Sequence, residues 1–353
     1  MATATLIGLD IGKHTFHAIA QDVAGHVLYK RQFTRTGLIE FLATHPPCRI
    51  VMEACAGAHW LARKLIEFGH HAQLIAPQYI RPFVTGNKND FIDAHAICEA
   101  ACRPSMRYVA IKSMQQQAVS SLHRMREARM AERIQTTNQI HALLLEFGIT
   151  LPLGMRGIRQ VPTLLATPSD DLPVMVRQIL LQQFEHVLLL ERLIQVLDQQ
   201  IATEARSNDV ATRLMTIPGI GPITASQLAA DAGNAKGYGK ARDFAASLGL
   251  VPRQHSTGGK AKLLGISRRG DKSLRRLLVQ CAHVIMLNAT RWNSAIAEWT
   301  RELMVRRHGN VVACAVANKL ARVVWAILAT GDEYHPHPRT LHEKQTAGRT
   351  GGE

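Results

Sequence analysis

The sequence predicts an α/β domain, then two long helices, and then a mainly helical C-terminal region. Three observations support this order. Residues 5–77 alternate β-rich apolar runs with amphipathic segments, residues 112–147 and 174–206 are long, charged and helix-forming, and the remainder places apolar segments between glycine-containing turns. A chain of 353 residues is long enough for two or three such domains.

The first 77 residues predict a mixed sheet. Apolar runs with period-two alternation predict strands, a Gly-containing turn separates the second from the third, and amphipathic runs predict helices, one of which stops at Gly69. The strands are expected at 5–12, 14–22, 26–34, 47–55 and 71–77, and the helices at 36–45 and 59–69. A β-meander followed by alternating helices and strands indicates both antiparallel and parallel pairing.

The middle of the chain predicts two long helices with a Pro/Gly-rich break between them at 148–173. The second helix carries "LLLERLIQVLDQQI" at near-heptad spacing, which favours an antiparallel coiled-coil arm. A helical bundle core is the alternative. Either arrangement is a common route to oligomers.

The C-terminal region begins near "MTIPGIGPITASQLAADAG", residues 215–233, and continues to helices at about 271–290 and 310–330. Its polar end is expected to be loose. The predicted boundaries are 1–110 for the α/β domain, 111–206 for the arm, 207–332 for the C-terminal domain and 333–353 for a flexible tail.

The composition points to a polyanionic partner. Lys and Arg number 42 against 27 Asp and Glu, a net charge of +15, for which nucleic acid is the default partner and a merely basic protein the alternative. The six cysteines form no CxxC pair, which argues against zinc and suits a reducing compartment. Without a signal peptide or eighteen uninterrupted apolar residues, the chain reads as cytoplasmic and not membrane-bound.

Four carboxylates occur where predicted strands end or a helix begins. Asp10 lies in an apolar strand, Glu53 ends another, and Asp90 and Asp93 share one face of a helix start. Each has an ordinary explanation, since Asp10 can cap a turn, Glu53 can meet Lys13 and the pair can favour a helix N-terminus. Together they match the hard oxygen ligands of Mg²⁺, which can assist phosphodiester chemistry.

Two further motifs suit phosphate binding. Gly219 and Gly221 form a "GIG" turn between apolar flanks, like a helix-hairpin-helix element that offers backbone N–H groups; a tight turn without a ligand is the alternative. Residues 236–276 then hold eleven Lys and Arg against two acids. The expected phosphate contacts are Arg253, Lys260, Lys262, Arg268, Arg269, Lys272, Arg275 and Arg276.

Ser256 lies inside this basic stretch, in the glycine-rich sequence "HSTGGK", which predicts a flexible loop. Glycines and lysines would let a serine approach a phosphate closely, although a serine is a weak nucleophile until its site activates it. A hydroxyl in such a loop is more often a turn former.

These motifs as a set closely resemble those of the DEDD transposases of bacterial insertion sequences, a family that includes the Piv-type DNA invertases. The resemblance rests on "GLDIGK", "MEACAG", "NKNDFIDAHAI" and "GLVPRQHSTGGKAKLLGISRRGDKSLRRLL", and spans roughly residues 5–330. It implies an N-terminal domain of RuvC-like (ribonuclease H-like) fold, with Asp10, Glu53, Asp90 and Asp93 as a tetrad for Mg²⁺ or Mn²⁺. Lys88 fits the family's K-x-D-x-x-D-A pattern, and it either touches a phosphate or balances the local charge.

The same resemblance implies a mechanism and partners. In this family a serine is thought to attack DNA and form a covalent 5′-phosphoserine-type link, with the acids contributed by a partner subunit, so a dimer or tetramer is expected. Ser256 is our choice; Thr257 is the one-residue alternative and Ser267 a distant third. Several members use a structured non-coding RNA to pair with donor and target double-stranded DNA. A bound RNA of this kind and a location at the nucleoid are therefore expected.

Two other functions stay open from the sequence alone. A structure-specific endonuclease of the Holliday-junction type would use the four acids and water, without Ser256. A non-enzymatic nucleic-acid-binding protein would keep the fold and its basic surface but cleave nothing. A covalent protein–DNA adduct would exclude both.

Overall fold

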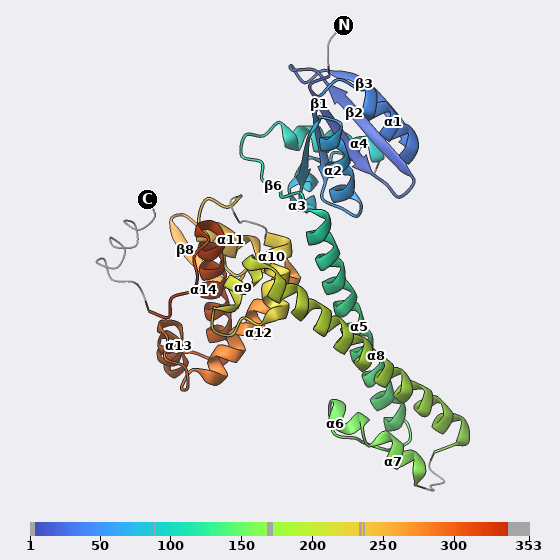
Figure 1. Ribbon diagram of the computed structural model, residues 1–353, viewed down its shortest axis with the longest axis vertical. Coiled ribbons are helices and arrows are strands. Elements are labelled where there is room, and N and C mark those ends of the chain that lie inside the picture. Colours follow the sequence, from blue (N-terminus) through green and yellow to red (C-terminus); the bar gives the residue numbers. More distant parts are fainter. Residues whose placement is uncertain (1–3, 88, 168–171, 233–234, 236, 338–353) are drawn as a thin grey trace. The chain divides into compact units, whose positions relative to one another are not determined.

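The computed structural model describes residues 4–87, 89–167, 172–232, 235 and 237–337 (Figure 1). The chain divides into two compact units. The first is formed by Met1–Gln117 with Ala230–Ala246 and Leu328–Thr330, and the second by the remaining segments. Each unit is described by itself.

The first unit is built on a six-stranded mixed sheet with the strand order β3-β2-β1-β4-β5-β6. Strands β1, β2 and β3 form the predicted antiparallel meander, and β4 and β5 extend the sheet in parallel from β1. The edge strand β6 was not predicted, because two residues are too few for an alternating pattern. The strands are β1 (Leu6–Ile11), β2 (Thr15–Gln21), β3 (Val27–Thr34), β4 (Arg49–Glu53), β5 (His71–Ile75) and β6 (Tyr108–Val109).

Side chains alternate between the two faces of this sheet, and each face is covered by helices. Ile7 and Leu9 pack on the face covered by α1 (Arg35–Thr44) and α2 (Ala58–Glu67). The opposite face presents Leu6, Ile19 and Val51 to α4 (Asp90–Ala101) and to the short turns α3 (Pro77–Ile80) and η1 (Arg81–Phe83). Alternation therefore turns Gly8 and Asp10 toward α4.

Gly8 allows α4 to lie unusually close to the sheet. A Cβ at this position would stand 2.4 Å from the Cys98 sulfur and 2.6 Å from the Ala94 carbonyl oxygen. The backbone oxygen of a helix cannot move aside without moving the helix. Gly8 therefore sets the distance between β1 and α4, and α4 carries two of the predicted acids.

Replacing Gly8 with alanine is expected to lower the free energy of unfolding by about 2 kcal/mol, because the added methyl group overpacks the contact. Urea denaturation of the purified protein measures this. The control is Gly239→Ala, in the same unit, since a Cβ there meets nothing within 4 Å. Equal stability of the two variants would show that α4 accommodates a side chain at Gly8.

The long helices α5 (Met114–Leu145) and α8 (Val174–Ser207) run antiparallel (Figure 1). Three polar links join them: Arg126 with Asp198, Arg133 with Glu191 at 3.6 Å, and His186 with Glu132 at 3.1 Å. Arg126, the earliest of the three α5 residues, pairs with Asp198, the latest of the three α8 residues, as an antiparallel pair requires. The Pro/Gly-rich segment at 148–173, predicted as a break, contains two short helices, α6 (Met155–Ile158) and α7 (Val161–Ala166).

The C-terminal region is mainly helical, as predicted, and two of its helices, α11 and α13, were not predicted. Its helices are α9 (Asp209–Met215), α10 (Pro222–Ala232), α11 (Ala241–Ser247), α12 (Lys272–Asn288), α13 (Ala295–Arg306) and α14 (Gly309–Thr330). Of the described helices, α14 alone has the length and apolar composition to cross a membrane. Its Val312, Val316, Leu320 and Val324 are fully buried in the protein, as in the core helix of a globular unit.

Candidate functional site

The acidic residues gather at the carboxyl edge of the central parallel strands. β1 and β4 pair in register up to Leu9 and Met52, and Asp10 and Glu53 are the residues that follow. Both therefore occupy the same level of neighbouring strands and turn toward α4. Asp93 lies in the first turn of α4, whose N-cap Asn89 accepts a hydrogen bond from the Phe91 N–H at 2.9 Å.

Three of the four acids line one cavity of about 540 Å³: Asp10, Glu53 and Asp93. Asp90 is not part of the lining. It lies beside His17, with its carboxylate oxygen 3.6 Å from the imidazole Nδ1. Lys88 lies outside the described residues. The other lining residues are Pro77, Gln78, Ile80, Arg81 and Val84.

The surroundings of the cavity raise the pKa values of two of its carboxyl groups. The pKa of Asp10 is raised from 3.8 to about 6, mainly by burial and further by the negative charges of Asp93 and Asp90, while His17 acts in the opposite direction. Burial and the charge of Asp93 also raise the pKa of Glu53. Burial and neighbouring negative charge thus make Asp10 and Glu53 harder to ionise, which is the situation that a bound cation relieves.

The donor set fits a hard divalent cation, because carboxylate oxygens are the ligands that Mg²⁺ and Mn²⁺ prefer. Within the described part of the chain, however, no three His, Cys, Asp or Glu side chains stand close enough together to enclose one ion. The acids therefore share a cavity without forming a closed ligand shell.

Two residues of this site were missed from the sequence. Arg81 brings a positive charge to the wall of the acidic cavity. His17 is buried and lies directly across the β1–β2 ladder from Asp10. Arg81 begins η1, after β5 and the short helix α3, and segments beyond the carboxyl ends of strands are where sites form, so its position was a usable signal. His17 lies in an alternating strand, where its sequence position gave no signal of a role at the site.

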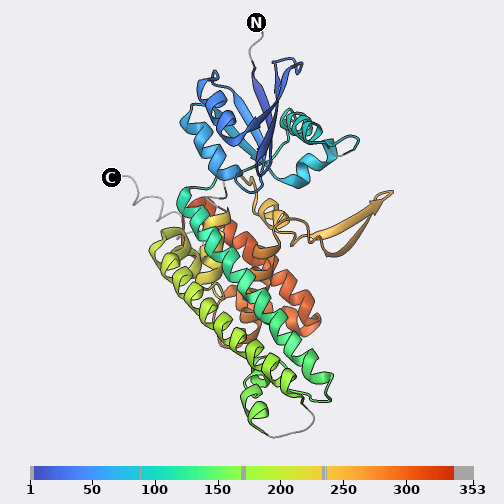
Figure 2. The same cartoon turned by 90° about the vertical axis from the view of Figure 1, so that its right-hand side faces the viewer.

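The basic stretch around Ser256 is a β-hairpin, which corrects the predicted flexible loop. Strand β7 (Pro252–Thr257) includes Ser256 and pairs with β8 (Lys260–Ile266). The two glycines between them, Gly258 and Gly259, have φ values of +56° and +77°, as a two-residue hairpin turn requires. Every residue of β7 is exposed, and Figure 2 shows the hairpin projecting from the helices of its unit.

The hairpin register separates the two candidate nucleophiles. Ser256 pairs with Ala261, and its Oγ accepts a hydrogen bond from the Gln254 side chain at 2.6 Å. Thr257 pairs with Lys260, and His255 pairs with Lys262. Because neighbouring residues of a strand face opposite sides, Thr257 shares its face with both lysines and Ser256 does not.

Two glycines fix the base of the hairpin. A Cβ at Gly249 would lie 2.4 Å from the Arg269 carbonyl oxygen, and one at Gly270 would lie 1.8 Å from the Ser247 carbonyl oxygen. Backbone hydrogen bonds join the same segments, from the Arg268 N–H to the Gly249 oxygen at 3.1 Å and from the Asp271 N–H to the Ser247 oxygen at 3.2 Å. The "GLG" and "RRGD" sequences thus clamp the two ends of the hairpin together.

Replacing Gly270 with alanine is expected to lower the free energy of unfolding by about 3 kcal/mol, since the side chain meets backbone and φ is +96°. Thermal melting measures the change. Gly265→Ala, on β8, is the control, because open space surrounds that position and its φ is ordinary. If Gly270→Ala and Gly265→Ala melt at the same temperature, Gly270 does not clamp the base of the hairpin.

The predicted phosphate-binding residues divide into two groups. Arg275 donates to the Leu248 carbonyl oxygen at 2.9 Å, and Arg276 pairs with Glu127 at 2.5 Å, so both have partners within their unit. The others have exposed side chains: Arg253, Lys260, Lys262, Arg268, Arg269 and Lys272.

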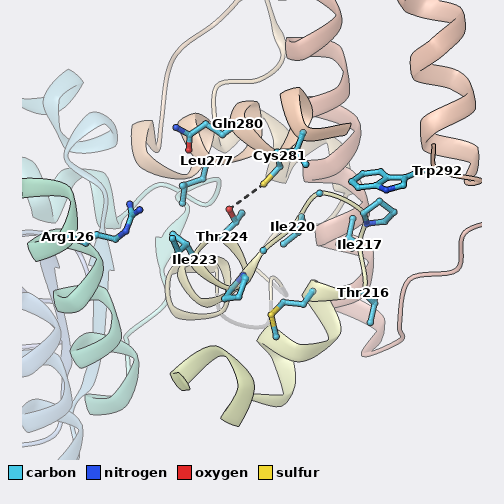
Figure 3. A pocket seen from close by; sticks show the side chains of 16 residues that line it. Arg126, Thr216, Ile217, Ile220, Ile223, Thr224, Leu277, Gln280, Cys281 and Trp292 are labelled. Atoms are coloured by element: carbon cyan, nitrogen blue, oxygen red, sulfur yellow. Dashed lines mark hydrogen bonds between the residues drawn. The ribbon is translucent and has the colours of Figure 1, made fainter. Parts of the chain in front are cut away.

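The "GIG" turn joins α9 to α10, as the helix-hairpin-helix prediction requires, and it borders a cavity of about 580 Å³ (Figure 3). The turn packs on α12. A Cβ at Gly219 would come within 2.9 Å of Ile285, and Thr224 and Cys281 meet at 3.4 Å between the Oγ1 and Sγ atoms. Gly221 has open space around it. Gly219 is thus needed for packing on α12, and both glycines line the cavity.

Two family models match separate parts of the chain. Residues 211–298 match the model of the "Transposase IS116/IS110/IS902 family", and residues 7–149 match the model DEDD_Tnp_IS110, described as "Transposase". The first match contains the turn and the hairpin. The second contains the sheet and all four acids.

Whole-chain relatives agree. The chain is 50% identical over 331 residues, 94% of its length and 98% of the relative's, to the "Transposase for insertion sequence element IS1328" of Yersinia enterocolitica. It is 35% identical over 335 residues, 95% and 92% of the two chains, to the corresponding protein of element IS1111A of Coxiella burnetii. A more distant relative, 23% identical over 358 residues (96% and 99%), is the "Pilin gene-inverting protein" of Moraxella lacunata. The chain therefore belongs to the IS110/IS116 family of insertion-sequence transposases, enzymes that cut and join DNA.

Proposed function

We propose that this transposase cuts and rejoins DNA with a divalent cation, Mg²⁺ or Mn²⁺, held by Asp10, Glu53, Asp90 and Asp93, and with Ser256 as its nucleophile. The observation that carries the proposal is the shared cavity of Asp10, Glu53 and Asp93 at the carboxyl edge of the sheet. When bound there, the cation would supply positive charge to the phosphate and lower the pKa of an attacking oxygen.

The residues of the chain have distinct tasks in this proposal. The Oγ of Ser256 bonds to the phosphorus of the scissile phosphodiester, the bond from phosphorus to the 3′-oxygen breaks, and the 3′-oxygen leaves as a hydroxyl. The Oγ proton passes to solvent or a nearby base. Return attack by a 3′-hydroxyl reverses the step on a new strand, so no nucleotide cofactor is consumed. Arg81, on the wall of the cavity, is placed to contact the phosphate.

The exposed basic residues of the hairpin and its base are proposed to hold donor and target double-stranded DNA. Lys260, Lys262, Arg268 and Arg269 can each neutralise one phosphate, so binding should weaken steeply with salt. Gly221 offers the backbone of its turn to a further phosphate. Lys88 is proposed as a nucleic-acid contact from the family pattern alone.

The family resemblance also supports a structured guide RNA, encoded by the element, that pairs with both DNAs. It supports a dimer or tetramer in which the acids and the serine of one active site come from different subunits, with α5 and α8 forming a coiled-coil arm. The RuvC-like fold, the three-domain division with a flexible tail, and a cytoplasmic, nucleoid-associated location belong to the same proposal.

The first experiment is to purify the protein from cells that carry its native flanking DNA and to sequence the RNA that stays bound in moderate salt. One discrete RNA encoded beside the gene is the expected result, and it would supply the guide for a cleavage assay with Mg²⁺. A mixture of cellular RNAs, or none, would overturn the guide and favour a protein-only recombinase.

A further inference from the structure

His17 is a buried polar side chain beside the acidic cavity, and the tetrad does not include it. It lies on β2 with 7% of its surface exposed, and it is the direct antiparallel partner of Asp10. Cross-strand partners share a face of the sheet, so His17 and Asp10 both turn toward α4. A buried imidazole is retained in a core only when its neighbours satisfy it.

Those neighbours are both in the first turn of α4. The imidazole Nδ1 lies 3.6 Å from the Asp90 carboxylate, and the ring packs edge-to-face on Phe91 with a centroid separation of 4.8 Å and an interplanar angle of 78°. One side chain of the sheet thus makes a polar and an apolar contact with consecutive residues of the helix. Together these contacts restrict both the position and the rotation of that turn.

A second contact fixes the same helix one turn further on. Gly8, on β1, meets Ala94 and Cys98 of α4 without space for a methyl group. The helix therefore contacts the sheet closely at its first turn through His17 and at its second turn through Gly8. Asp93 lies between these two contacts, and it is the α4 acid that faces the cavity.

We propose that His17 is a positioning residue for the metal-binding acids. It holds the first turn of α4 so that Asp93 stands opposite Asp10 and Glu53, and it reaches the cation only through the placement of those carboxylates. This inference rests on the proposed metal role of the acids. Neighbours that orient metal ligands typically change metal affinity by about 10- to 100-fold when they are replaced.

The test compares His17→Leu with His17→Asn in the full-length protein. Leucine has a similar volume and keeps an apolar contact with Phe91, but it offers nothing to Asp90. Asparagine retains an N–H near the Nδ1 position. Mn²⁺ binding is measured by isothermal titration calorimetry, and DNA cleavage is measured as a function of Mg²⁺ concentration once a cleavage assay exists.

We expect His17→Leu to bind Mn²⁺ at least about 10-fold more weakly than the wild type, and His17→Asn to recover part of the loss. Cleavage by His17→Leu should need more Mg²⁺ but approach the wild-type rate at saturation. Loss of stability alone would not shift the Mg²⁺ dependence in this way.

The matched control is His70→Leu. His70 is also a buried histidine of the first unit, with 4% of its surface exposed, and its ring contacts the Leu42 oxygen at 2.8 Å and the Cys48 N–H at 3.2 Å. It lies beside the beginning of β5, at the opposite end of the parallel strands from Glu53. Its replacement should lower stability and leave Mn²⁺ affinity unchanged.

The Mn²⁺ affinity of Asp10→Asn, measured in parallel, distinguishes failure of the positioning role of His17 from failure of the proposed metal site. If Asp10→Asn weakens Mn²⁺ binding and His17→Leu binds as tightly as wild type, the positioning role is overturned and the metal site stands. If Asp10→Asn also binds like the wild type, the proposed metal site is wrong and the role of His17 falls with it. If His17→Leu does not fold, the Mn²⁺ affinity of His17→Asn decides. Asparagine is expected to keep the contact with Asp90, so a Mn²⁺ affinity below that of Asp10→Asn would contradict the positioning role.

Discussion

Replacing Ser256 with alanine is expected to abolish the covalent protein–DNA link and, with it, strand exchange. The hydroxyl is the only group of that side chain able to bond to phosphorus, and loss of a nucleophile lowers the rate by several orders of magnitude. The change should cost little stability, because Ser256 is exposed on a hairpin strand and its side-chain contact is one hydrogen bond from Gln254.

The measurement is gel electrophoresis under denaturing conditions after incubation with labelled DNA and Mg²⁺, where the adduct migrates as a slow, protease-sensitive band. Thr257→Ala is the matched control, since Thr257 occupies the next position of the same strand and faces the opposite side. An adduct that survives in Ser256→Ala and disappears in Thr257→Ala would move the nucleophile by one residue. If both variants and Ser267→Ala cleave normally without an adduct in any of them, the acids act with water, as in a junction-type endonuclease.

Asp10→Asn should lower DNA cleavage by at least about 100-fold, because it removes a charged donor from the centre of the acidic cavity. The same change should stabilise the metal-free protein. The folded protein holds the pKa of Asp10 near 6 against an ordinary value of 3.8, so folding favours the protonated carboxyl. The stability that this group contributes is present below about pH 4 and is lost as the pH rises through 6.

At pH 8 in EDTA we therefore expect Asp10→Asn to be more stable than the wild type by about 1 kcal/mol, a value reduced for the partial exposure of this side chain. The difference should disappear near pH 4, where the wild-type carboxyl is protonated. Thermal melting across this pH range measures both. A variant that is less stable than wild type at pH 8 would show that Asp10 is stabilised by its surroundings, contrary to the repulsion described above.

The sequence predicted the sheet well, for a physical reason. Strands β1, β2 and β4 must bury one or both faces, so their apolar residues repeat with the period of the pleat and can be read directly. The acids were readable because a carboxylate next to a buried run, such as Asp10 or Glu53, costs free energy unless something compensates for it. The cavity contains three of the four predicted acids, but sequence spacing did not show that Asp90 lies aside from it.

The hairpin was missed because it buries nothing. Residues 252–257 are all exposed, so no apolar alternation marks them as a strand, and the Gly-Gly pair that forms the turn is equally typical of a flexible loop. Packing roles were hidden for a related reason. Gly219 also allows α12 to approach, and this packing role depends on residues more than sixty positions away.

His17 shows the limit more sharply. A histidine in an alternating strand has no local feature that separates a buried polar contact from an exposed one. Its importance comes from the register with Asp10 and from the approach of α4, and both are properties of the folded sheet.

The clamped base of the hairpin has a consequence for how such a protein changes over time. Gly249 and Gly270 bear the structural constraint, while the residues between Pro252 and Ile266 are largely outside the core. Most substitutions at exposed positions leave stability nearly unchanged, so this segment can vary without approaching the threshold for unfolding. For folding, the sequence of the hairpin can therefore change as long as Gly249 and Gly270 are kept.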